Sequence, residues 1–185
     1  MDNVIFRFQW GVVVLASLGA AIYDVRIGRI PNVLTLPLLT AGIIWSIWHG
    51  GVAGLGEAVG ACLLVSLPYL LLFVFAGGGA GDAKLAGAIG AWVGLRSGLV
   101  VLFCISIAAV IFAIVLTAKQ KKFKVLWNNI ILLIASLFTS IFSGGIKKEL
   151  TVPIFTGEYQ SVAMPYGVAI FAGVCLAGGY ILWNG

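Results

Sequence analysis

Two aspartates are the residues of this sequence best suited to chemistry. Asp24 follows one long apolar run, and Asp82 closes a Gly-Ala-Gly-Asp tetrapeptide that follows another. Ionisable side chains in or beside a bilayer are energetically costly, which makes them candidates for function. Two carboxylates held close together share a proton, so that one can act as a general base while the other donates a proton. The pair therefore predicts acid–base chemistry, provided that the fold brings both side chains to one place.

The composition predicts an all-α polytopic membrane protein. Of the 185 residues, 62% are hydrophobic and 9% are charged, and the mean hydropathy is +1.15. A soluble domain carries about 25% charged residues. We therefore expect one integral-membrane domain over residues 1–185, in which the 25 glycines allow close helix packing. The net charge of +5 is expected to orient the protein in the lipid bilayer and not to bind nucleic acid.

Apolar runs predict about six transmembrane helices. A full crossing takes about 20 residues, so the fourth of these runs is short. A seventh run, 127–143, has basic flanks and is expected to lie in the membrane interface. The six predicted spans are about 8–23, 33–49, 55–76, 84–95, 98–118 and 164–183.

Charge counting places both aspartates on one side of the membrane. If the loop after the first span is cytoplasmic, nine of the 11 lysines and arginines fall inside, with only Arg7 and Arg96 outside. Both chain termini then lie outside. Asp24 ends a span that runs inward, and the third span returns inward before Asp82, so both carboxylates are expected at the cytoplasmic boundary.

Each aspartate also has a purely structural interpretation. Asp82 could cap the helix that follows it, and Asp24 could simply end a helix, although a helix C-terminus disfavours negative charge. On the same argument we expect Asp82 to be the charged base and Asp24 the protonated acid. Gly79 and Gly81 would let another backbone approach Asp82 closely.

The three cysteines give no sign of a metal or disulfide site. Cys62, Cys104 and Cys175 each lie within an apolar run, and no two of them form a C-x-x-C pair. Buried cysteines of this kind act as small hydrophobic residues. No metal and no cofactor are expected.

The ordered motifs resemble those of the type IV prepilin peptidases, which are GxGD intramembrane aspartyl proteases. The resemblance covers roughly residues 15–180, and the short, CpaA- or TadV-like form that serves Flp/Tad-type pili is the most similar. Longer members carry a cytoplasmic domain with paired C-x-x-C motifs, so methyltransferase activity is not expected here. The residues that carry the resemblance are Asp24, Arg29-Ile30-Pro31-Asn32, Gly79-Ala80-Gly81-Asp82-Ala83-Lys84-Leu85 and Pro165-Tyr166-Gly167.

The resemblance implies a GxGD-type protease bundle in the bacterial cytoplasmic (inner) membrane. Its activity would be aspartic endopeptidase cleavage of the leader of prepilins or pseudopilins, after a glycine at the cytoplasmic face. The substrate partner would carry a hydrophobic N-terminal helix. The catalytic residues would be Asp24 and Asp82, and the residues that bind substrate or shape the site would be Gly79, Gly81, Lys84, Arg29, Pro31, Asn32, Pro165, Tyr166 and Gly167.

A different class of protein stays open as the alternative. A small multi-pass transporter or channel subunit could use Asp24 and Asp82 as proton or cation sites. The sequence shows no clear inverted repeat and no acid deep within a span, and both observations count against that alternative.

Overall fold

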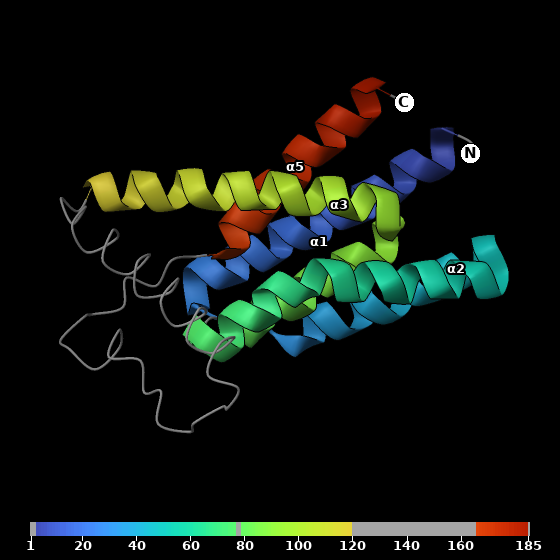
Figure 1. The fold of residues 1–185 in the computed structure, drawn as a ribbon, viewed down its shortest axis with the longest axis horizontal. Helices are drawn as coiled ribbons and strands as arrows, with labels where there is room; N and C mark the ends of the chain where they lie inside the picture. The colour runs from blue at the N-terminus through green and yellow to red at the C-terminus, as the bar shows by residue number, and fades with distance from the viewer. Residues whose placement is uncertain (1–2, 77–78, 120–165, 185) are drawn as a thin grey trace, which may run out of the picture.

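The computed structural model describes residues 3–76, 79–119 and 166–184, and their regular structure is helical (Figure 1). The elements are α1 (Asn3–Ile27), α2 (Asn32–Ala76), α3 (Ala80–Lys119) and α5 (Tyr166–Asn184). All four helices are long and apolar enough to cross a membrane. The prediction of an all-α integral membrane protein is confirmed in this part of the chain. The predicted interfacial segment, 127–143, lies outside the described residues.

Helices α2 and α3 each double back on themselves (Figure 1). The break falls at Gly51 in α2, with φ 57°, and at Gly94 in α3, with φ 75°. Both φ values lie in the left-handed region, which glycine enters without steric cost. Each helix is therefore a hairpin of two limbs, 32–50 and 52–76 in α2, and 80–93 and 95–119 in α3. Together with α1 and α5, these four limbs give six helical segments, which correspond to the six predicted spans. That each segment crosses the membrane stays a prediction.

The helices extend further than the apolar runs that predict them. Helix α1 continues to Ile27, where Gly28 (φ 69°) ends it and donates its N–H to the carbonyl of Asp24 at 2.8 Å. Helix α3 begins at Ala80. Helical hydrogen bonding does not require apolar side chains, so it continues beyond the hydrophobic stretch. Asp24 consequently lies in the last turn of α1, and Asp82 lies in the first turn of α3.

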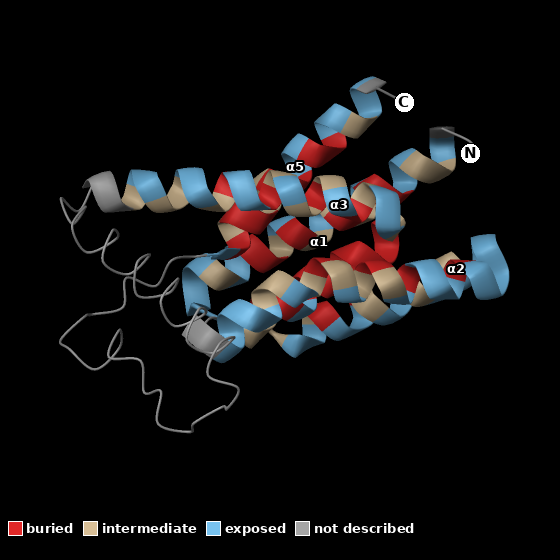
Figure 2. Ribbon diagram, in the orientation of Figure 1, coloured by how far each residue is buried: buried red, intermediate tan, exposed pale blue. Residues whose placement is uncertain are grey.

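The first limb of α3 forms the centre of the bundle (Figure 2). Leu85, Ala88 and Ile89 are fully buried in it. Its small residues allow close contact with the second limb of α2, because a Cβ added at Gly90 would lie 2.5 Å from the carbonyl oxygen of Ala61. At 14 residues this limb is about 21 Å long, shorter than the hydrocarbon core of a bilayer.

The remaining contacts join α5 and the first limb of α2 to this centre. Gly173 of α5 packs against the backbone of Ile105 in α3. On the other side, the indole N–H of Trp92 donates to the carbonyl of Leu38 in α2 at 2.7 Å. Figure 1 shows that the end of α1 and the starts of α2, α3 and α5 gather at one end of the bundle, here called the site end. The two hairpin turns and both termini lie at the opposite end, called the turn end.

Candidate active site at the site end of the bundle

Asp24 is held by the first turn of α5. The backbone N–H of Gly167 donates a hydrogen bond of 2.7 Å to Oδ2 of Asp24. Only a residue without a side chain can approach so closely, because a Cβ at position 167 would lie 2.9 Å from Cβ of Asp24 and 3.2 Å from Cα of Ala21. The free N–H groups of a helix N-terminus favour a carboxylate beside them.

Asp82 lies in the first turn of α3 and is only 9% exposed. Gly79 and Gly81, the two glycines before Asp82, each allow a different part of the chain to approach closely. A Cβ at Gly79 would lie 2.6 Å from Oδ2 of Asp82, so this glycine makes room for the carboxylate itself. A Cβ at Gly81 would lie 3.1 Å from the carbonyl oxygen of Ile30, so this glycine makes room for the chain between α1 and α2.

The start of α2 is joined directly to the start of α3. Nζ of Lys84 donates to Oδ1 of Asn32 at 2.9 Å. The carbonyl of Pro31 accepts the N–H of Leu34 at 3.1 Å, which begins the helix. Two motifs that are far apart in the sequence therefore form one corner of the site end. Arg29 is exposed beside it.

The structure brings the two aspartates within electrostatic range of each other. The charge of Asp24 acts on the Asp82 carboxyl group. The field of Asp82 also reaches the phenol of Tyr166. Of the residues expected to shape the site, Pro165 lies outside the described part of the chain.

The sequence analysis did not single out Tyr69, which lies beside Asp82. Gly90 meets Ala61 of the antiparallel second limb of α2, and Gly87 meets Ser66. Continuing this register to Asp82 leads to Tyr69, whose phenol is within the field of that carboxylate. A lone tyrosine near the end of an apolar run is typical of a membrane interface, so the sequence carries no signal for this neighbour.

The structure also removes the basis for assigning unequal roles to the two carboxylates. The expected roles rested on Asp82 at a helix N-terminus and Asp24 at a helix C-terminus. Asp24 does lie at the end of α1, but its carboxylate also faces the N-terminus of α5 through Gly167. Both carboxylates therefore adjoin a helix N-terminus, and helix dipoles no longer distinguish base from acid.

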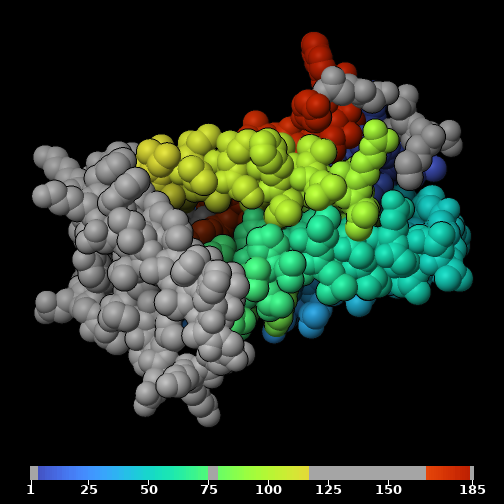
Figure 3. Space-filling view, viewed as in Figure 1, coloured from blue at the N-terminus to red at the C-terminus, as the bar shows by residue number. Residues whose placement is uncertain are grey.

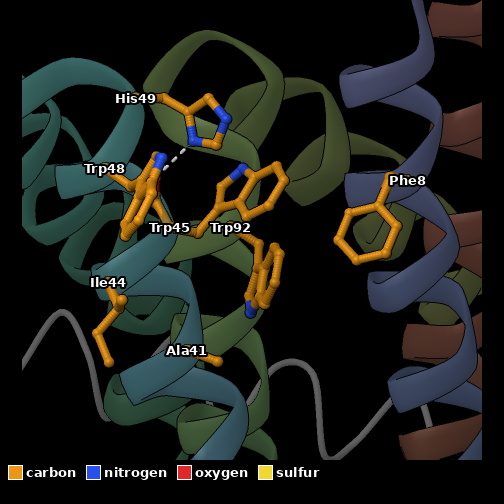
Figure 4. Close-up of a pocket in the computed structure, with 7 residues that line it drawn as sticks. All are labelled: Phe8, Ala41, Ile44, Trp45, Trp48, His49 and Trp92. Atoms are coloured by element: carbon orange, nitrogen blue, oxygen red, sulfur yellow. Dashed lines mark hydrogen bonds between the residues drawn. The ribbon is translucent and has the colours of Figure 1, made fainter.

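An aromatic pocket of about 580 Å³ is lined by residues of α1, α2 and α3 (Figure 4). Trp45 is its central ring, 5.7 Å from the ring centre of Trp92 and 5.3 Å from that of Phe8. Phe8 precedes Asp24 by 16 residues of α1, which corresponds to about 24 Å. The pocket thus belongs to the turn end, where its rings hold α1, α2 and α3 together.

The fold and the site define a helical integral membrane protein with two carboxylates at one end of its bundle. The model of the type IV leader peptidase family matches residues 11–114, and the chain belongs to this family. The matched range contains Asp24, Asn32, Asp82 and Lys84, whereas Gly167 lies beyond it.

Curated relatives agree with the family. The chain is 32% identical over 135 residues to a prepilin leader peptidase/N-methyltransferase of Neisseria gonorrhoeae, covering 65% of this chain and 47% of that protein. It is 40% identical over 92 residues to the protein of the same name from Aeromonas salmonicida, covering 46% and 31%. The match to the Xanthomonas campestris protein of that name is 36% over 128 residues, covering 63% and 45%. The chain thus spans less than half the length of these relatives. No solved structure matches it.

Proposed function

We propose that this protein is an aspartic endopeptidase that removes the leader peptide from type IV prepilins or pseudopilins, cutting after a glycine. Membership of the leader peptidase family and the names of the relatives support this function. The observation that carries the proposal is the placement of Asp24 in the last turn of α1 and of Asp82 in the first turn of α3, both at the site end of the bundle. Both side chains are fixed by glycine contacts that leave no room for a larger residue.

The proposed chemistry needs only the two carboxylates and a water molecule. One carboxylate takes a proton from water as the water oxygen attacks the scissile carbonyl carbon, and the other, protonated, donates to the carbonyl oxygen. The carbon–nitrogen bond then breaks as the first carboxyl group passes the proton that it took from water to the leaving nitrogen, and the second carboxylate takes a proton back from a hydroxyl group of the intermediate. The Gly167 N–H fixes one oxygen of Asp24. Rigid placement of this kind is what general acid–base catalysis requires.

The charge distribution supports a site end that faces the cytoplasm. Arg26, Arg29 and Lys84 lie at the site end, whereas Arg7 and Arg96 lie toward the turn end. Positive charge collects on the cytoplasmic side of membrane proteins. We accordingly place the protein in the bacterial cytoplasmic membrane, where the site meets a basic leader while the hydrophobic helix of the substrate stays in the lipid. The proposal covers the peptidase and not the N-methyltransferase activity in the relatives' names.

The test is leader removal by the purified full-length protein in lipid vesicles. Asp24→Asn and Asp82→Asn should each abolish cleavage of a type IV prepilin while helix content and melting temperature are kept. Glu57→Gln is the matched control, because Glu57 is exposed at the turn end, beside Gly94. If either aspartate variant cleaves at a near-normal rate, the paired-carboxylate mechanism is wrong. Proton or cation flux through wild-type vesicles without cleavage would instead support the transporter or channel alternative.

A further inference from the structure

The second limbs of α2 and α3 separate toward the site end. They are in contact near the turn end, where a Cβ added at Gly98 would lie 3.2 Å from Cγ2 of Val65. Beyond this contact no residue in 66–74 of α2 is buried, and none is buried in 109–116 of α3. Figure 3 shows the result as a hollow between α2 and α3 with α5 at its floor. We call this hollow the V-shaped cleft, with 66–74 and 109–116 as its walls.

The walls of the V-shaped cleft are apolar. Neither wall contains a charged residue, and the hydroxyl of Ser66 is bonded to the carbonyl of Leu63. Leu72, which is 41% exposed, lies on the same face of α2 as Val65, seven residues before it. Ala109 and Phe112 are partly exposed and lie on the face of α3 that continues from Gly98. From Val65 to Val74 the first wall rises by about 14 Å, which is between two and three helical turns. Such walls match an apolar helix and not a polar peptide.

The cleft leads to both carboxylates. Tyr69 belongs to the α2 wall, and the register set by Gly90 against Ala61 and Gly87 against Ser66 places it opposite Asp82. Helix α5, at the floor, holds Asp24 through Gly167. Ile44, by contrast, lies on the first limb of α2 beside the aromatic pocket of the turn end.

We propose that the V-shaped cleft is the docking surface for the hydrophobic helix of the substrate, entered sideways from the lipid. This inference rests on the proposed function, because it places the apolar helix that follows the scissile bond. The bond must reach the two carboxylates while the helix after it stays in the bilayer, since an apolar helix of about 20 residues is stable there. A cleft that opens to lipid and ends at the carboxylates satisfies both conditions. Lipid tails then fill the cleft only when substrate is absent.

Photo-crosslinking tests this placement. The crosslinking amino acid p-benzoylphenylalanine is placed singly at Leu72, Ala109 or Phe112 in the full-length Asp82→Asn protein in vesicles. The probe is a synthetic peptide with a short basic leader, a glycine and an apolar helix of about 20 residues. Crosslinks to the apolar helix are expected from both walls. Leu15 and Ile44 are the matched controls, because they are 69% and 62% exposed on other faces of the bundle.

The outcomes separate this inference from the proposed function. Crosslinks to the peptide from Leu15 or Ile44 and not from the walls would overturn the docking surface. The docking surface would also be overturned if the wall positions crosslink only to lipid, or do not crosslink at all, although the same substituted proteins with Asp82 intact still cleave the peptide. If the wild-type protein cleaves nothing but the peptide helix is crosslinked to both walls, the docking surface stands and the proposed function fails.

A kinetic measurement provides a second test. Ala109→Trp narrows the cleft and should raise KM for the peptide several-fold while kcat is unchanged. A peptide with the same leader and glycine but no apolar helix should show no change in KM. An equal effect on both peptides would mean that position 109 acts through the stability of the fold, and would contradict the docking surface.

Discussion

The backbone N–H of Gly167 is bonded to Oδ2 of Asp24 at 2.7 Å, across 143 residues of sequence. This bond fastens the first turn of α5 to the last turn of α1. It also gives Gly167, which the family resemblance implies only as a residue that binds substrate or shapes the site, a direct contact with a proposed catalytic group. The bond depends on backbone proximity, which a side chain at position 167 would prevent.

Gly167→Ala should reduce leader cleavage by roughly 10- to 100-fold, because a hydrogen bond to a charged group contributes about 1.5–3 kcal/mol. The added methyl group would lie 2.9 Å from Cβ of Asp24 and push α5 away from α1. The measurement is kcat/KM on a prepilin in vesicles. Gly179→Ala is the matched control in the same helix, because nothing lies within 4 Å of a Cβ there. Equal activity in the two variants would contradict a role for the Gly167 contact.

Gly79→Ala should lower kcat by roughly 100-fold, since a displacement of about 1 Å at a reacting group can cost that much. Its Cβ would lie 2.6 Å from Oδ2 of Asp82 and force the carboxylate to move. Gly19→Ala in α1 is the control, because that position is open. Leader cleavage and melting temperature are measured on both variants. A Gly79→Ala protein that keeps its kcat would show that Asp82 does not need its present position.

The helical architecture could be predicted from local features of the sequence. The lengths of the apolar runs and the breaks between them indicate where the chain turns back, and the structure places two of these turns at Gly51 and Gly94. Charge counting indicates that Asp24 and Asp82 share one end of the bundle. These features depend on transfer free energies and backbone freedom, which belong to single residues and short segments.

The details of the site could not be predicted in this way. The approach of Gly167 to Asp24 and the register that brings Tyr69 to Asp82 depend on how small residues pack between helices. Many registers satisfy the same apolar pattern, because lipid-facing and core-facing side chains are equally hydrophobic. The helix-end argument for unequal aspartates considered each helix without its neighbour, so it did not include the contact of Asp24 with the start of α5. Which aspartate is the base stays a prediction.

Gly42 and Trp92 should show coupled effects on stability. A Cβ at Gly42 would lie 2.7 Å from Cδ1 of Trp92, so Gly42→Ala should lower the free energy of unfolding by about 1–3 kcal/mol through overpacking. Trp92→Phe removes the indole bond to Leu38 and should cost about 0.5–1.5 kcal/mol. In the double variant the smaller ring leaves room for the methyl group, so the total cost should be less than the sum. Denaturant unfolding in detergent measures all three, and simple additivity would show that the two residues do not press on each other.

Tyr69→Phe tests whether Tyr69, the neighbour of Asp82, takes part in the reaction. The change keeps the ring, which packs against the apolar core, and removes only the hydroxyl group. If the O–H group of Tyr69 stabilises the charge that develops at Asp82, its loss should lower kcat about 10-fold with KM unchanged. Tyr180→Phe, toward the other end of α5, is the control and should leave kcat unaltered. A Tyr69→Phe protein with normal kcat, or one in which only the melting temperature falls, would show that Tyr69 serves packing alone.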